Sequence, residues 1–236
     1  MSPPNAAGLL AFDVPARPAV CGGEPETSAG RETPASALRA EAQPSPRGKR
    51  ALDVAASVVL LGGLVVVGPL VVAAVRLTSR GPALYRQERL GLGGVPFSMF
   101  KFRTMRHSDA PEEARWATEN DPRVTPVGRL LRKTRLDELP QVLNILRGEM
   151  SLVGPRPEQP AIASRLAAAI PGYARRLAVR PGLTGWAQVH HGYDQTLDDV
   201  RIKLRYDLEY VEMASVAADL GILARTVRVV LGMHGR

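Results

Sequence analysis

A long apolar run limits what this chain can fold into more than any other feature of the sequence. After Arg50 the chain reads "ALDVAASVVLLGGLVVVGPLVVAAV", and roughly 22 consecutive positions after Asp53 carry no charge, which is enough for a membrane helix. A helix buried in a soluble core is the alternative, but such a helix rarely needs an uncharged run of this length. The sequence therefore predicts a membrane helix at residues 49–78.

Two details of the run bear on how it would sit in a bilayer. Gly68 and Pro69 interrupt it, and a helix should kink or break there because proline lacks a backbone donor and glycine is flexible. Basic residues flank both ends: Arg47, Lys49 and Arg50 before the run, and Arg76, Arg80, Arg86 and Arg89 after it. Because cytoplasmic flanks carry an excess of such residues, we favour a re-entrant hairpin, with a kinked spanning helix as the alternative.

The composition on either side of this run separates a leader from a folded part. Residues 1–48 are rich in Pro, Ala, Gly, Ser and Glu and show no sustained apolar period, so we expect a disordered leader. The total of 236 residues suits one domain with an appendage. We therefore place a single folded domain at residues 79–236.

Charge, cysteine content and missing motifs limit the binding partners and the classes of site that this chain can have. The formal net charge of +8 predicts anionic partners, namely phosphates, lipid headgroups or nucleic acid. Cys21 is the only cysteine, which excludes an intramolecular disulfide and a metal site made of thiolates. The sequence also lacks a Walker loop, a G-x-S-x-G motif and a dinucleotide fingerprint, which removes the commonest NTPase, hydrolase and Rossmann interpretations.

The pattern after residue 79 predicts an α+β domain that is small and mostly helical. Gly81 and the glycines within residues 91–94 separate short stretches. In the second stretch Phe100 and Phe102 alternate with Lys101 and Arg103, which predicts either a β-hairpin with one basic face or a strand with a solvated face. The segment "TPVGRLLRKT" has the period of an amphipathic helix, and the tail after residue 197 is helical in period as well. We expect amphipathic surface helices of this kind to lie on a membrane or close the core.

Two adjacent acids stand among arginines in the segment "RKTRLDELPQVLNILRGEMSLVGPRP". Asp137 is predicted to be the N-cap of a helix that ends at Gly148, and Glu138 beside it would be ordinary helix-start chemistry. The same position has a chemical meaning, because a helix terminus and nearby arginines favour an ionised carboxylate. An ionised carboxylate is what a nucleophile or a magnesium ligand requires.

Two proline-rich loops display further polar side chains. Arg156 stands between two prolines, where it is either a positioned phosphate clamp or an exposed loop charge. The second loop carries Arg180, Thr184 and Gln188. The adjacent His190 and His191 make a poor metal pair, because neighbouring side chains point apart.

Four motifs together resemble a known family. After the apolar segment come, in order, "SRGPALYRQERLG", "FKFRTM", "LRKTRLDELPQVLNILRGEMSLVGPRP" and "RPGLTGWAQV". In this order they are similar to the bacterial sugar transferases, the monotopic polyprenyl-phosphate glycosyl-phosphate transferases, over roughly residues 49–231. The resemblance implies a cytoplasmic catalytic domain attached to a re-entrant helix-break-helix in the bacterial inner membrane.

The resemblance also implies an activity. Members transfer a sugar-1-phosphate from a UDP-sugar to polyprenyl (undecaprenyl) phosphate and release UMP, which starts exopolysaccharide, capsule or glycoconjugate synthesis. Membrane lipid, the UDP-sugar and the polyprenyl phosphate are then the partners, and nucleic acid is not one. A second copy of the chain is a further candidate partner, through pairing of the apolar segments.

The family's functional residues carry over as follows. Asp137 occupies the place of the nucleophile, which forms a phospho-sugar intermediate and helps to hold Mg²⁺, and Glu138 occupies the place of its partner acid. Arg132 and Arg156 match phosphate-binding arginines. We assign nucleotide or sugar contacts to Arg180, Thr184 and Gln188, and the helix break to Gly68 and Pro69.

The chain departs from the family pattern at three places. Gly68 stands where many members have serine, residues 190–193 replace a common Asn-Gly-Arg, and "MASVAADL" replaces a Trp-rich stretch. The alternative to an enzyme is a non-catalytic basic adaptor or scaffold at the membrane that binds anionic lipid or nucleic acid, and the change at residues 190–193 is the departure that favours a scaffold. Such an adaptor would depend steeply on salt and would not need the acid pair.

Overall fold

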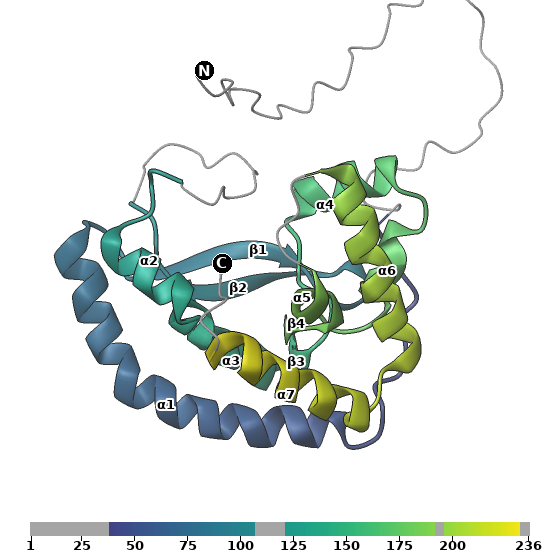
Figure 1. Cartoon of the computed structure of the whole chain (residues 1–236), viewed down its shortest axis with the longest axis horizontal. Helices are drawn as coiled ribbons and strands as arrows, with labels where there is room; N and C mark the ends of the chain where they lie inside the picture. Colours follow the sequence, from purple (N-terminus) through teal and green to yellow (C-terminus); the bar gives the residue numbers. More distant parts are fainter. Residues whose placement is uncertain (1–37, 107–120, 192–195, 232–236) are drawn as a thin grey trace, which may run out of the picture. The chain divides into compact units, whose positions relative to one another are not determined.

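The structure of the chain is a computed structural model that describes residues 38–106, 121–191 and 196–231. All of these residues belong to one unit, which spans Glu32–Arg236. Its secondary structure mixes helices with short strands, as predicted (Figure 1). Residues 1–37 of the predicted disordered leader lie outside the described residues.

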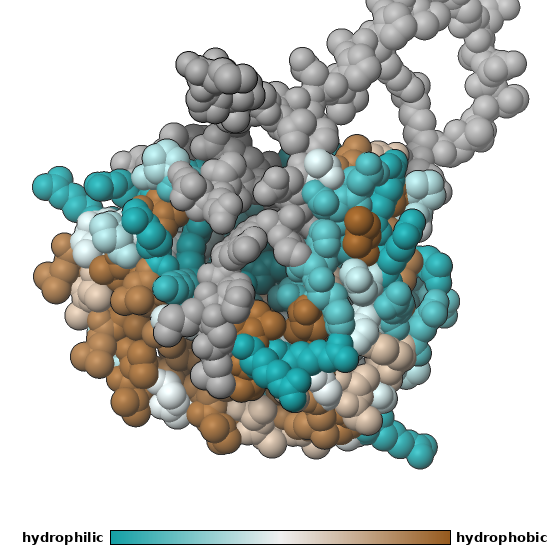
Figure 2. Space-filling model, viewed as in Figure 1, coloured by the Kyte–Doolittle hydropathy of each residue, from teal (hydrophilic) through white to brown (hydrophobic). Residues whose placement is uncertain are grey.

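The apolar run forms one long helix, α1 (Lys49–Thr78), of 30 residues. It is long and apolar enough to cross a membrane, and only 17% of its apolar window is buried inside the protein. The large apolar side chains that α1 exposes are Val54, Val58, Val59, Val65, Val66, Leu70 and Leu77. Figure 2 shows the apolar surface that follows this helix along the lower left of the view. Because so large an exposed apolar surface is unfavourable in water, α1 is suited to contact lipid.

The glycine-punctuated stretch after α1 folds into the predicted β-hairpin. β1 (Leu84–Leu90) pairs antiparallel with β2 (Pro96–Phe102), and the short 3-10 helix η1 (Leu92–Gly94) joins them. Gly94 has a φ of 82°, and a Cβ at this position would collide with the carbonyl group of Leu38. Glycine is therefore required here both by the backbone conformation and by the close approach of another segment.

Gly68 and Pro69 do not divide α1 into two helices, in contrast to the predicted helix-break-helix. The helix continues through both residues, and Figure 1 shows it curved. Proline cannot donate to the carbonyl four residues earlier and its ring crowds that carbonyl, which bends a helix without having to end it. Gly68 is buried, and a Cβ added to it would contact Leu64 and Phe102. The predicted break is therefore a place where α1 packs closely against β2.

Residues 38–48, which the sequence assigned to the leader, pack against the folded unit. Leu38 is buried in an apolar cluster, and the backbone N–H of Gln43 donates to the carbonyl of Ala178. The side chain of Arg180 donates to the hydroxyl of Ser45. The packed unit therefore begins before the predicted boundary at residue 48.

Short helices and a small parallel sheet make up the rest of the described unit. In chain order these elements are α2 (Pro126–Lys133), η2 (Leu136–Gln141), α3 (Val142–Arg147), β3 (Ser151–Val153), α4 (Pro160–Ala169), η3 (Tyr173–Ala178), β4 (Gly182–Thr184), α5 (Trp186–His190), α6 (Leu197–Met213) and α7 (Val216–Leu231). The amphipathic helix predicted from "TPVGRLLRKT" is α2, and the predicted helical tail is the pair α6 and α7. β3 and β4 pair in parallel, which brings the two proline-rich loops together.

Three apolar clusters hold these elements together. One contains Val71, Val75, Phe102 and Leu131, and so joins α1 to β2 and α2. A second joins α3 and β3 to α6 and α7, and a third joins α4 and η3 to α6. The hairpin and η2 therefore lie between a membrane-type helix on one side and a helical layer on the other.

Charged side chains at the start of α1 fix this helix to the second cluster. Lys49 is buried, and its ammonium group donates to the carboxylate of Asp219, to the hydroxyl of Tyr210 and to a carbonyl of β3. One turn later, Asp53 accepts hydrogen bonds from a hydroxyl and an N–H of β3. Buried charges of this kind are stable only while every partner is present.

We predict that Lys49→Met lowers the free energy of unfolding by about 3–5 kcal/mol, because it leaves the carboxylate of Asp219 buried without a counter-charge. Denaturant titration of the purified protein in detergent measures this loss. As a control, Arg201→Ala removes an exposed ion pair with Asp198 and should cost less than about 1 kcal/mol. A similar cost for both variants would contradict the proposed anchoring.

Candidate active site

The two adjacent acids lie on η2, between α2 and α3. Arg135 precedes this 3-10 helix with a φ of 59°, and Asp137 and Glu138 occupy its first turn. The prediction that Asp137 is the N-cap of a longer helix is wrong, because Arg135 holds that position and α3 begins only at Val142. The physical reason is Pro140, which cannot donate to an α-helical ladder, so regular hydrogen bonding starts after it.

Glu138 is the buried centre of a cluster of charges. Its side chain is 8% exposed, and its Oε1 accepts from Nζ of Lys101 at 3.2 Å and from Nη2 of Arg156 at 2.8 Å. Burial alone would raise the pKa of Glu138, but the charges of Arg156 and Lys101 outweigh it and hold that pKa well below its usual range. Glu138 is therefore an ionised carboxylate that holds two cations in place.

Asp137 has a different environment. Its residue is 7% exposed, and its Oδ1 is buried without a hydrogen-bond partner among the described residues. Burial, and after it the negative charge of Glu138, raises the pKa of Asp137 to about 6, against the attraction of Lys101, Arg132 and Arg156. A buried carboxylate oxygen without a donor is costly unless a cation, a phosphorus centre or a water occupies the position in front of it.

The two acids therefore differ: Glu138 binds Lys101 and Arg156, whereas Asp137 has a carboxylate oxygen that is available for chemistry. Environments that push two neighbouring carboxyl pKa values apart are a common sign of separate catalytic roles. Among the described residues, no group of three or more His, Cys, Asp or Glu gathers in one place. Mg²⁺ usually takes one or two protein carboxylates and completes its shell with substrate oxygens and water, so it does not require a larger cluster of protein ligands.

The two arginines predicted to bind phosphate lie in this neighbourhood in different ways. Arg156 contacts Glu138 directly, as described above. Arg132 lies on α2, where its Nε donates to the hydroxyl of Thr104 at 2.9 Å, and its positive charge acts on Asp137. Both therefore contribute positive potential around the acids.

The side chains predicted to bind nucleotide or sugar serve the protein's own loops. Arg180 donates to Gly148 and Ser45, and the hydroxyl of Thr184 pairs with that of Thr226. Gln188 donates to a carbonyl at its own loop, and its Oε1 is buried without a partner among the described residues. No contact recorded within 38–106, 121–191 and 196–231 joins these three side chains to Asp137 or Glu138.

The altered segment after Gln188 lies partly outside the described residues, which stop at His191 and resume at Thr196. The ring of His190 lies 3.9 Å from that of Trp186 and stacks on Tyr206 at 5.4 Å. Its Nε2 lies 2.5 Å from Nη1 of Arg225. His190 therefore joins α5 to α6 and α7 and has no metal partner in the described part of the chain.

Sequence reasoning missed Lys101 as a site residue. It was assigned to a basic face of the hairpin, yet its side chain is only 18% exposed and points to Glu138. Burial lowers the pKa of Lys101, and the negative charge of Glu138 opposes this. The alternation with Phe100 and Phe102 did signal a lysine on one defined face of β2, but only the packing of η2 against that face shows what the lysine meets.

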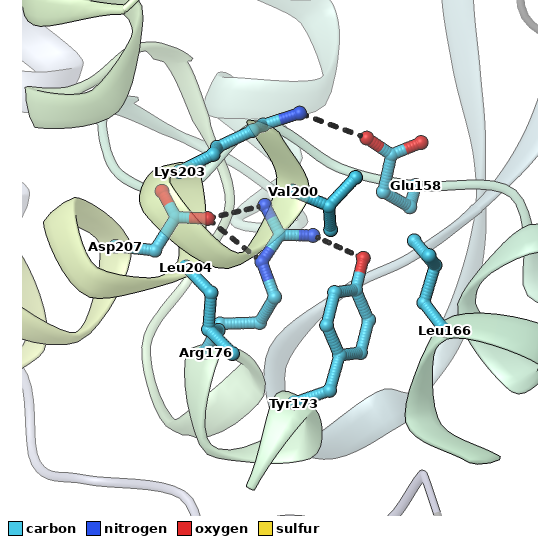
Figure 3. Close-up of a pocket in the computed structure, with 8 residues that line it drawn as sticks. All are labelled: Glu158, Leu166, Tyr173, Arg176, Val200, Lys203, Leu204 and Asp207. Atoms are coloured by element: carbon cyan, nitrogen blue, oxygen red, sulfur yellow. Dashed lines mark hydrogen bonds and ion pairs between the residues drawn. The ribbon is translucent and has the colours of Figure 1, made fainter. Parts of the chain in front are cut away.

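The loop that carries Arg156 is held in place by a buried network, shown in Figure 3. Arg176, on η3, donates its Nη2 to the backbone carbonyl of Arg156 at 2.8 Å and pairs with Asp207 of α6 at 2.7 Å. Its Nη1 donates to the hydroxyl of Tyr173 at 3.1 Å. The space among these side chains leaves no room even for a water molecule, so the network is structural and does not form a ligand pocket.

The next two residues of the same loop are held as well. Arg89 of β1 donates to the carbonyl of Pro157 at 3.0 Å. Glu158 is buried and forms ion pairs with Arg89 at 3.5 Å and with Lys203 of α6 at 3.3 Å. The backbone of residues 156–158 is therefore fixed from η3, β1 and α6, which orients the side chain of Arg156 toward Glu138.

Comparison with known proteins adds to this geometry. The sequence profile of the family described as "Bacterial sugar transferase" matches residues 45–233, which include every element from α1 to α7. The acid pair, Lys101 and Arg156 all lie inside the matched region.

Individual relatives share 40–48% identity with the chain. A UDP-N-acetylgalactosamine-undecaprenyl-phosphate N-acetylgalactosaminephosphotransferase of Aeromonas hydrophila is 42% identical over 79% of this chain and 44% of its own length. A UDP-glucose:undecaprenyl-phosphate glucose-1-phosphate transferase of Caulobacter vibrioides is 48% identical over 76% of this chain and 68% of its own length. An uncharacterized sugar transferase of Bacillus subtilis is 40% identical over 79% of this chain and 89% of its own length. The chain thus spans less than half the length of the Aeromonas relative.

We predict that Asp137→Asn stabilises the protein without ligands by on the order of 1–3 kcal/mol at pH 8. The folded-state pKa of about 6 lies above the ordinary value of 3.8, so the aspartate costs nothing below 3.8, costs more as the pH rises from 3.8 to 6, and costs the full amount above 6. The gain from asparagine should therefore shrink between pH 8 and pH 5, as measured by denaturant titration at both pH values. An equal gain at the two pH values would show that the burial of charge is not its cause.

We also predict that Arg176→Lys loosens the loop of residues 156–158, because lysine keeps the charge but cannot bridge Asp207 and the carbonyl of Arg156 together. The backbone amides of Leu90 and Gly182 donate to carbonyls of Glu158 and Pro155, and hydrogen exchange at these amides should be faster by on the order of 10-fold or more.

The amides of α2 serve as an internal reference for this exchange experiment, since α2 makes no recorded hydrogen bond with the network. Arg175→Gln is the matched control, because Arg175 adjoins Arg176 in sequence but forms only an exposed pair with Glu212. Equal acceleration at α2 in the Arg176→Lys protein would mean a global loss of stability and not a local release of the loop.

Proposed function

This chain belongs to the bacterial sugar transferase family, and we propose that it transfers a sugar-1-phosphate from a UDP-sugar to undecaprenyl phosphate with release of UMP. The observation that carries the proposal is the buried pair of acids, in which Glu138 holds Lys101 and Arg156 while Asp137 presents an unpartnered oxygen. Relatives named for this reaction with glucose and with N-acetylgalactosamine support the substrate classes. The identity of the sugar is left to a screen of UDP-sugars.

The first step is a displacement at the phosphorus that bears the sugar. Above a pH of about 6 the carboxylate of Asp137 is ionised, and one of its oxygens attacks this phosphorus. A bond forms between the carboxylate oxygen and phosphorus, the bond to the bridging oxygen breaks, and UMP leaves with the electron pair. Lys101, Arg132 and Arg156 offset the negative charge that would otherwise keep the carboxylate away from a diphosphate.

The second step returns the enzyme to its starting state. An oxygen of undecaprenyl phosphate attacks the same phosphorus, the bond to Asp137 breaks, and the carboxylate is regenerated. Glu138 takes part by positioning the two cations, because its Oε1 holds both of them. Since the second substrate is anionic as well, the same positive potential serves both steps.

Mg²⁺ is part of this proposal, and the donor set fits it. The buried, unpartnered Oδ1 of Asp137 is a hard oxygen ligand, and the protein contributes few ligands, as is usual for Mg²⁺ bound together with substrate phosphates. When bound, the ion would neutralise charge on the diphosphate. Lys101, Arg132 and Arg156 would add to this neutralisation.

We place the chain at the bacterial inner membrane, with the catalytic domain in the cytoplasm. The exposed apolar surface of α1 supports membrane attachment, and an acceptor lipid that stays in the bilayer requires it. The basic residues at both flanks of α1 support a re-entrant course, and Figure 1 shows that the helix is curved. Pairing with a second copy through the apolar helix would be compatible with this arrangement.

The product suits the first membrane step of exopolysaccharide, capsule or glycoconjugate synthesis. A non-catalytic adaptor would need only a basic surface, whereas this chain buries its acids and cations together, at an energetic cost that binding alone would not require. We therefore place the adaptor second.

We predict that the protein sustains UMP release over many turnovers only when undecaprenyl phosphate and Mg²⁺ are both present, and that Asp137→Asn lowers this rate by at least about 10³-fold. Radiolabelled donor should leave a covalent adduct on Asp137 when the lipid is withheld. Asp198→Asn, which makes the same change at an exposed acid of α6, is the control and should keep full activity. Formation of the lipid product by Asp137→Asn at the normal rate would refute the role of this carboxylate.

A further inference from the structure

A small pocket lies beside Glu138. Its walls are formed by Arg89, Met99, Lys101, Gln141, Arg156 and Pro157. Two of these side chains, Lys101 and Arg156, are the cations that Glu138 holds, so the pocket adjoins Glu138. The space between the walls has room for little more than one oxygen-sized atom.

Gln141 also lines this pocket, and neither catalysis nor the support of a loop accounts for its side chain. It is the last residue of η2, one turn after Asp137, and is only 2% exposed. Its Nε2 is buried and has no hydrogen-bond partner in the described part of the chain. A buried N–H donor without an acceptor costs about 1–3 kcal/mol, so an unpaired amide here points to an acceptor that arrives from outside the protein.

The chemistry of the other walls says what kind of acceptor fits. The guanidinium groups of Arg89 and Arg156, the ammonium group of Lys101 and the amide N–H₂ of Gln141 are the donors that the lining residues carry. Three of them are cationic, so a negatively charged oxygen is favoured over a neutral one. The size of the pocket admits one such oxygen and excludes a sugar ring or a nucleobase.

We propose that this pocket binds one non-bridging oxygen of the phosphoryl group in transfer, with Nε2 of Gln141 as its fixed hydrogen-bond donor. The inference rests on the proposed function and adds to it a specific subsite and a further catalytic residue. Charge spreads over the non-bridging oxygens during phosphoryl transfer, and a donor held rigidly at one of them stabilises the transition state more than the ground state. Because η2 carries both residues, Gln141 moves with the nucleophile Asp137.

A single fixed subsite has a stereochemical consequence. The sugar-bearing phosphorus of a UDP-sugar has two non-bridging oxygens, and replacing either one by sulfur gives one of two diastereomers. Sulfur is larger than oxygen and a weaker hydrogen-bond acceptor, so the diastereomer that directs sulfur into the pocket should react slowly. The other diastereomer keeps oxygen in the pocket and should react nearly as well as the natural donor.

The experiment compares UMP release from the two β-phosphorothioate diastereomers by the wild type and by Gln141→Leu, with Mg²⁺ and undecaprenyl phosphate present. We expect the wild type to prefer one diastereomer by on the order of 10-fold or more in kcat/KM, and Gln141→Leu to lose most of that preference. With the natural donor, kcat of Gln141→Leu should fall by on the order of 10²-fold, with a smaller change in KM. Gln159→Leu removes the carboxamide of a glutamine outside the pocket and should keep the wild-type preference.

Binding of inorganic phosphate gives a readout that does not need turnover. Phosphate should raise the thermal unfolding temperature of the wild type and of Gln159→Leu more than that of Gln141→Leu. A Gln141→Leu protein that unfolds at the wild-type temperature without phosphate but gains as much from phosphate would overturn the subsite, and so would an unchanged diastereomer preference. If the wild type releases no UMP from any natural UDP-sugar, the proposed function fails instead, and the phosphate measurement still tests the pocket.

Discussion

The burial of two adjacent carboxyl groups is the constraint on which the rest of this structure depends. Neither Asp137 nor Glu138 is exposed enough for water to stabilise two negative charges, so the protein must supply cations or leave one acid close to neutral. It does both, since Lys101 and Arg156 neutralise Glu138, and the pKa of Asp137 rises to about 6. Because Lys101 and Arg156 both bind Glu138, Oδ1 of Asp137 is left without a partner among the described residues.

The cations have to be held rigidly for this division to persist. Lys101 stands on a hairpin strand that packs against α1 and η2, and Arg156 stands on a loop fixed by Arg176 and by the ion pairs of Glu158. These supports come from both ends of the chain, because α6 supplies the partners of Arg176 and Glu158 while α1 supports β2. The apolar helix α1 and the helices that close the domain thus support the same few charges.

Much of this arrangement was predictable from local patterns. The apolar run, the hairpin, the amphipathic α2 and the helical tail each repeat with their own period, and the acid pair stands out by its neighbours in sequence. What escaped prediction depended on distant contacts: the packing of residues 38–48, the parallel pairing of β3 with β4, and the unbroken course of α1 through Pro69. Asp137 was wrongly expected to cap a helix, because the effect of Pro140 on the first turn was underestimated.

The sequence by itself determined the membrane helix, the identity of the two acids and the match of Arg132 and Arg156 to a phosphate-binding pattern, since each depends on residue type, spacing or motif order within a short segment. Only the tertiary structure decided that Lys101 and Arg156 share one oxygen of Glu138, and that Gln141 and Arg89 line a pocket beside it. It also decided that Arg180, Thr184 and Gln188 form hydrogen bonds within the protein. The reason is that burial and charge pairing depend on segments far apart in the chain, and the pattern of one segment carries no information about which other segment covers it.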